Sequence, residues 1–157
     1  MRLFNSNKKN LLKQSNDTPL FSLNGKILLC KVVDVYDGDS CKVVFRFNKK
    51  YYKWNVRMNG YDSPEIKISK NNPNREQLKK IGIEAKNYFI KLLNFNNKNN
   101  KQLFYIKCYK FDKYGRLLGE LYNNYHNAIN NMSSINNDMI ISGNGVPYDG
   151  GTKISFV

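Results

Sequence analysis

Several residues and patterns that characterise common protein classes are scarce in this sequence. No run of about 18 apolar residues occurs, because lysine or aspartate interrupts every candidate, and this excludes a membrane-spanning helix. The three cysteines, Cys30, Cys41 and Cys108, lie far apart without CxxC spacing. We therefore expect three buried thiols rather than a disulfide framework or a cysteine metal site. The single histidine, His126, lies in an asparagine-rich stretch and is not expected to be catalytic.

Acidic residues are also few compared with basic ones. The 157-residue chain has 26 Lys and Arg against 12 Asp and Glu, which gives a formal charge of +14. Such an excess is typical of proteins that bind a polyanion, such as nucleic acid or an anionic membrane surface. Abundant lysine and asparagine can also follow from an A/T-rich genome, so charge alone leaves both explanations open. At 41% hydrophobic and 13% aromatic residues, the composition predicts one packed core.

The first 20 residues are basic and rich in asparagine and serine. They lack the apolar segment of a secretory signal, so we expect a flexible basic arm at 1–20 and a protein of the cytoplasm or nucleus. A weak organelle presequence is the other interpretation of the same residues, and the composition does not separate the two.

Turn residues divide the rest of the chain into short strands and helices. Strands are expected over 26–36, 40–47 and 52–58, with Asp37-Gly38 as the turn between the first two. There follow a long exposed loop over 66–80, a helix over 83–93 with Gly82 at its start, strands over 103–111 and 117–122, a loop over 123–134 and a short helix over 136–142. Five strands with a helix between the third and fourth predict a mainly β (α+β) OB-fold barrel, which often binds oligonucleotides.

Three polar clusters fall at the ends of the predicted strands. They are DGDS at 37–40, RMNGYDSPE at 57–65 and DKYGR at 112–116. Each one alone has the composition of a surface turn. Together they also supply the groups that a phosphate-processing site needs, namely carboxylates for a metal and guanidiniums for phosphate.

Oxygen ligands and guanidiniums could meet at these turns. Ca²⁺ prefers carboxylates, main-chain carbonyls and water, so Asp39, Asp62 and the carbonyl of Ser63 could form an open metal site. A guanidinium matches phosphate oxygens bidentately, which gives Arg57 and Arg116 a possible role beside that site.

The clusters and their order resemble the staphylococcal nuclease (thermonuclease-like) family. The matching segments are VYDGDS at 35–40, VRMNGYDSPE at 56–65, IGIEAKNYF at 81–89, FDKYGRLLGELY at 111–122 and PYDGGTK at 147–153. The resemblance implies one barrel domain over 21–153 and a Ca²⁺-dependent nuclease that hydrolyses phosphodiester bonds of DNA and RNA with little sequence specificity, leaving 3′-phosphates. The tail resembles that of eukaryotic and large-DNA-virus members, and we expect no counterpart of the long C-terminal helix of the bacterial enzyme in these 157 residues.

The resemblance also implies a role for each matched residue. Calcium would be held by Asp39, Asp62 and the Ser63 carbonyl. Glu65 would act as general base or orient the attacking water, and the two arginines would bind the scissile phosphate. The implied catalytic residues are therefore Arg57, Glu65 and Arg116.

Further residues are candidates for substrate binding. Tyr148 would either stack on a nucleotide or pack against the protein, and Lys67 and Lys70 lie in a loop that borders the active site in this family. A charge run such as theirs is otherwise a solvated surface. Asn136 matches a family asparagine that ties the barrel to the following helix.

The expected partners are single-stranded or frayed DNA and RNA, with no membrane contact, and we expect a monomer. The alternative to an enzyme is a catalytically inactive nuclease-like module that binds nucleic acid or a protein partner. Such degenerate copies typically lose the carboxylates or arginines, and this chain retains all of them.

Overall fold

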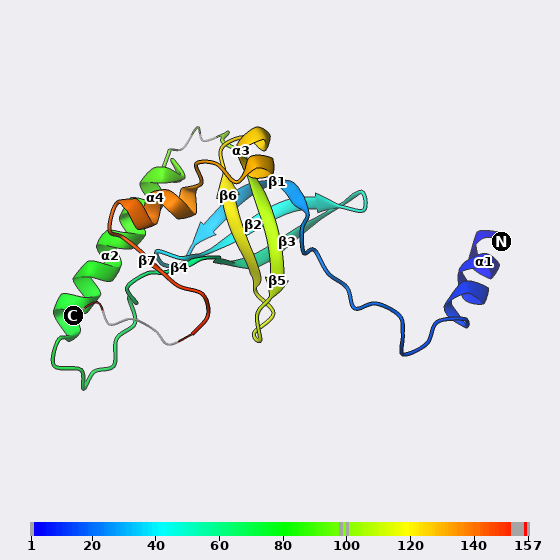
Figure 1. Ribbon diagram of the computed structural model, residues 1–157, viewed down its shortest axis with the longest axis horizontal. Helices are drawn as coiled ribbons and strands as arrows, with labels where there is room; N and C mark the ends of the chain where they lie inside the picture. Colours follow the sequence, from blue (N-terminus) through cyan, green and yellow to red (C-terminus); the bar gives the residue numbers. More distant parts are fainter. Residues whose placement is uncertain (1, 98, 100, 152–155, 157) are drawn as a thin grey trace.

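The computed structural model describes residues 2–97, 99, 101–151 and 156. The last two residues of the predicted domain, Thr152 and Lys153, lie outside the described residues. The described residues form four helices and seven strands (Figure 1). In chain order these are α1 (Arg2–Leu11), β1 (Ile27–Val35), β2 (Ser40–Phe47), β3 (Lys50–Met58), β4 (Tyr61–Asp62), α2 (Arg75–Leu92), β5 (Phe104–Phe111), β6 (Leu117–Tyr122), α3 (Tyr125–Asn130), α4 (Ile135–Ile141) and β7 (Val146–Pro147).

Five strands close into a barrel in the order β1-β2-β3-β6-β5. The pairs are antiparallel except for β3 and β6, which run parallel. Side chains alternate along each strand, so Cys41, Val43 and Phe45 of β2 are buried in the core while Lys42 and Arg46 lie on the outer face. This arrangement confirms the predicted five-stranded OB-fold barrel.

The barrel core also contains the three cysteines. Cys30, Cys41 and Cys108 are free, and all three are buried. Burial raises the pKa of Cys41 and of Cys108 to about 12. The prediction of buried thiols is therefore confirmed.

Helix α2 begins earlier than predicted. The loop expected over 66–80 ends at Asn74, and Gly82 lies inside the helix instead of at its start. The first two turns of α2 contain glutamate, glutamine and lysine, which are good helix formers, and the polar composition of this stretch concealed that propensity. The buried side of the helix is formed by Gly82, Ala85 and Phe89.

The predicted loop over 123–134 is also partly wrong, because α3 forms within it. Asn124 caps the start of α3, its side chain accepting a hydrogen bond from the Asn127 amide. Asn131 ends the helix in the left-handed conformation, with φ of 50°. The asparagines at both ends cap this helix, although an asparagine-rich composition had predicted a loop.

Asn136 joins the barrel to α4. Its amide nitrogen donates to the carbonyl oxygens of Asn59 (2.8 Å) and Gly119 (3.2 Å), and its oxygen accepts from the Leu121 amide at 3.1 Å. Through these hydrogen bonds, Asn136 of α4 connects the helix to the end of β3 and to strand β6, as the resemblance implied.

The N-terminal segment contains α1, where the sequence indicated an arm without regular structure. Figure 1 shows α1 away from the barrel, at the end of an extended stretch. No helix in the described part of the chain is both long enough and apolar enough to cross a membrane.

Candidate functional site

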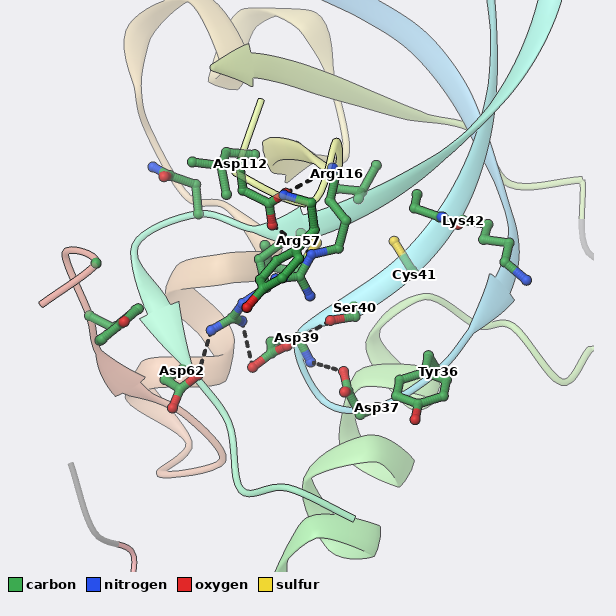
Figure 2. A pocket seen from close by; sticks show the side chains of 18 of the residues that line it. Tyr36, Asp37, Asp39, Ser40, Cys41, Lys42, Arg57, Asp62, Asp112 and Arg116 are labelled. Atoms are coloured by element: carbon green, nitrogen blue, oxygen red, sulfur yellow. Dashed lines mark hydrogen bonds and ion pairs between the residues drawn. The ribbon is translucent and has the colours of Figure 1, made fainter. Parts of the chain in front are cut away.

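An open cleft of about 920 Å³ lies where the β1–β2 turn, the end of β3 and the β5–β6 turn meet. All three polar clusters of the sequence contribute to it, although they are far apart in the chain. Its charged lining residues include Asp39, Arg57, Asp62, Glu65, Asp112 and Arg116. Figure 2 shows Arg57 between Asp39 and Asp62, with Arg116 and Asp112 on the adjoining side.

Arg57 bridges the two carboxylates. Its Nη2 donates a hydrogen bond to Asp62 Oδ1, and its Nη1 lies 2.5 Å from Asp39 Oδ2 without hydrogen-bond geometry. The side chain of Asp62 is only 2% exposed, and that of Asp39 is 8% exposed. Because so little water reaches them, each carboxylate depends on a nearby positive charge.

Asp39 is held in place from several directions. Its Oδ2 accepts hydrogen bonds from the amide (2.9 Å) and the hydroxyl (3.1 Å) of Ser63, and its Oδ1 accepts from the Ser40 hydroxyl at 2.9 Å. A Cβ on Gly38 would lie 2.7 Å from Ser63 Oγ, so the turn approaches the Ser63 segment as closely as glycine allows.

Tyr61 and Asp37 also support this turn, and neither was among the site residues predicted from the sequence. The Tyr61 hydroxyl donates to the Gly38 carbonyl at 2.7 Å, and burial followed by the charge of Asp39 raises the pKa of Tyr61 well above its usual value. Asp37 Oδ1 accepts from the Asp39 amide at 3.1 Å. Burial, and then the Asp39 charge, raise the pKa of Asp37 to about 6.

Arg116 is oriented by Asp112, four residues earlier in the same turn. Its Nε donates to Asp112 Oδ2 at 2.6 Å, while Asp112 Oδ1 accepts from the amides of Tyr114 (2.8 Å) and Arg116 (2.9 Å). Burial alone would raise the pKa of Asp112, but hydrogen bonds from Arg116 and the Tyr114 amide outweigh it and lower that pKa. The turn therefore presents a guanidinium of fixed direction to the cleft.

Glu65 is exposed and lines the cleft, directly after four buried residues, and its backbone packs closely on α2. A Cβ on Gly82 would lie 2.6 Å from the Glu65 carbonyl oxygen and 3.0 Å from that of Pro64. Only a residue without a side chain permits this approach. Gly82 thus sets the distance between α2 and Glu65. The sequence pattern predicted Gly82 at the start of the helix and did not indicate this contact.

The three candidates for substrate binding lie in different places. Tyr148 lines the cleft, its amide donating to the Gly60 carbonyl (3.0 Å) and its hydroxyl to the Gly151 carbonyl (2.9 Å). Lys67 does not line the cleft, but its ammonium lies 5.2 Å from the ring centroid of Tyr36, and Tyr36 does line the cleft. Lys70 is exposed and does not line the cleft.

The donor set suits a hard divalent cation. Two carboxylates face one cationic group, and the buried Nη1 of that group has no well-formed hydrogen bond, so the guanidinium is an imperfect partner for Asp39. Within the described ranges no group of three or more His, Cys, Asp or Glu is arranged to hold a metal. A cation here would therefore need Asp39, Asp62, a main-chain carbonyl and water.

Comparison with protein families gives an independent result. The family model described as "Staphylococcal nuclease homologue" matches residues 55–150, and no curated protein matches the chain. The matched range contains Arg57, Asp62, Glu65 and Arg116, whereas Asp39 precedes it and is brought to the same cleft by the β1–β2 turn. Because the match covers more than half of the sequence and the barrel is that expected of the family, the chain belongs to the staphylococcal nuclease homologue family.

Proposed function

We propose that this protein is a Ca²⁺-dependent nuclease that hydrolyses phosphodiester bonds of DNA or RNA with little sequence specificity and leaves 3′-phosphates. One observation carries the proposal. Two buried carboxylates, two guanidiniums and an exposed glutamate from three distant segments line one open cleft. The net charge of +14 would favour the approach of a polyanion to that cleft.

The two arginines would stabilise charge on the phosphoryl group. Phosphodiester hydrolysis adds negative charge to the non-bridging oxygens, and fixed guanidiniums act where that charge develops. Arg116 already has its direction set by Asp112. Arg57 forms ion pairs with Asp39 and Asp62 in the structure, so binding phosphate requires it to exchange partners.

Glu65 would accept the proton of the attacking water. It is exposed on the cleft wall, so water reaches it directly. Asp39, Asp62 and the Ser63 carbonyl would hold Ca²⁺, which when bound supplies further positive charge to the phosphate. Tyr148 would contact the nucleotide, and Lys67, beside Tyr36, would attract phosphates at the cleft edge.

The test is cleavage of end-labelled single-stranded DNA and RNA in Ca²⁺, Mg²⁺, Mn²⁺ or EGTA. We expect shortened products with Ca²⁺, and a polymerase should extend DNA products only after phosphatase treatment. Retention of DNA without shortening in Ca²⁺ would refute the enzyme proposal and favour the inactive binding module.

A second measurement tests the role of Glu65. Glu65→Gln should lower the rate by about 10²–10⁴-fold, because removal of a general base costs roughly that factor. Glu84→Gln, a matched change at an exposed position of α2, should leave the rate unchanged. A Glu65→Gln variant as active as the parent would exclude the assigned proton acceptor even if the parent cleaves.

A further inference from the structure

The outer face of the β2–β3 hairpin continues from the wall of the cleft. The strand register pairs Ser40 with Arg57 and Lys42 with Asn55, and all four residues line the cleft. Because side chains alternate, the next two pairs on the same face are Val44 with Lys53 and Arg46 with Tyr51. Figure 1 shows this hairpin extending beyond the other strands of the barrel.

This part of the face is cationic and carries an exposed aromatic ring. Arg46 and Lys53 are exposed, and Tyr51 is 76% exposed. Among the described residues no acid forms an ion pair with either cation. Lys31 of β1, paired with Val44, adds a further exposed charge to the same face.

An acid of the adjacent strand β1, Asp34, is already neutralised. Asp34 of β1 is paired with Lys42 in the strand register, and their side chains form an ion pair at 2.8 Å. The positive charge of the hairpin beyond this pair is therefore not offset locally.

We propose that Arg46, Tyr51 and Lys53, here called the hairpin track, bind a single nucleic-acid strand outside the cleft. This inference rests on the proposed function, since it extends the site for the same polymer. Exposed cations bind phosphates of any polyanion, but the exposed tyrosine paired with Arg46 adds a surface on which an unpaired base stacks. Same-face residues of a strand recur about every 6.6–6.8 Å, so the track offers successive contacts to an extended chain.

The track predicts a dependence on substrate length. A dinucleotide should occupy only the cleft, whereas a long oligothymidylate should also reach the hairpin. Neutralising the track in an Arg46→Gln/Lys53→Gln double variant should weaken binding of the long strand, with cleavage of the dinucleotide unchanged. The slope of log K against log salt should fall by about 1.4, because each lost phosphate contact contributes about 0.7 with single strands.

The binding experiment uses fluorescence anisotropy in EGTA, so that no cleavage occurs. The matched control is Lys91→Gln/Lys101→Gln, which removes two charges at exposed positions at the end of α2 and in the following loop. Tyr51→Ser should weaken binding of oligothymidylate about fivefold or more but not binding of an abasic strand of equal length. An Arg46→Lys/Lys53→Arg variant, which keeps both charges, should bind like the parent.

The results separate this inference from the proposed function. If the neutralised variant binds the long strand like the parent, or the control variant loses as much affinity, the track is refuted. If Tyr51→Ser weakens the abasic strand equally, base stacking is refuted. If the parent never cleaves DNA but the track variants still lose affinity, the nuclease proposal fails and the track stands as a binding surface.

Discussion

Replacing Gly82 by alanine should reduce activity far more than stability. The added Cβ would lie 2.6 Å from the Glu65 carbonyl oxygen, whereas ordinary contact begins at 3.4 Å, so α2 and the Glu65 backbone must separate by about 0.8 Å. Alanine gains about 0.8–1.0 kcal/mol of helix propensity over glycine. Overpacking costs about 1–3 kcal/mol. The two effects leave a net destabilisation of about 1 kcal/mol.

The effect on the rate is expected to be larger. Misplacing a reacting group by about 1 Å can cost on the order of 10²-fold in rate. We therefore expect Gly82→Ala to lower the cleavage rate by on the order of 10²-fold, provided that Glu65 acts as proposed. The assay is the initial rate on a fluorogenic single-stranded oligonucleotide in Ca²⁺, with stability measured by urea unfolding.

Two controls make this prediction specific. Asn87→Ala, at an exposed position of the same helix, gives the propensity gain without the contact and should leave the rate unchanged. Glu65→Gln gives the full loss. If Glu65→Gln is inactive and Gly82→Ala retains the parent rate, then the close contact with α2 does not position Glu65, and the reasoning from the missing Cβ is wrong.

Three further predictions concern residues around the cleft. Arg57→Gln should destabilise the metal-free protein by about 3–5 kcal/mol in urea unfolding, because two buried carboxylates lose their counter-charge. An unchanged urea midpoint of unfolding would contradict this. Asn136→Ala should cost about 3 kcal/mol, because it removes three hydrogen bonds to buried or half-buried backbone groups, and a loss below 1 kcal/mol would show that water replaces the amide. Asp112 has a lowered pKa, so its contribution to stability is complete above its unfolded pKa of about 3.9 and is lost as pH falls through its folded value. Asp112→Asn should therefore reduce the difference in stability between pH 6 and pH 3, and an unreduced difference would contradict this.

The strands and the location of the site could be predicted because their signals are local. The Asp37-Gly38 and Asn59-Gly60 turns bound alternating apolar runs, and such runs predict strands. Catalytic candidates then fall at strand ends, where turns leave side chains free to converge. The structure places Asp39, Arg57 and Arg116 in one cleft, although they belong to separate clusters in the sequence.

The features that sequence missed depend on contacts between distant segments. The role of Gly82 requires the Glu65 backbone to lie against α2, and the bridge formed by Arg57 requires two turns to meet. The early start of α2 was missed for a different reason, because polar residues with good helix propensity resemble an exposed loop. Lys70 lies off the cleft because nothing in a charge run fixes where a loop points.

The parallel contact between β3 and β6 has a consequence for the order of folding. It joins segments about 60 residues apart, pairing Arg57 with Leu118 and Met58 with Gly119. The β1–β5 pair also joins distant segments, whereas the other three barrel pairs are local hairpins. Contacts with such long sequence separation carry a large loop-closure cost and tend to form late. Arg57 and Arg116 lie on opposite sides of this seam. Hydrolytic activity should therefore return only with the last refolding phase. The fluorescence of Trp54 should recover in the same phase, because its side chain contacts Gly115 and Phe111 of the β5–β6 hairpin.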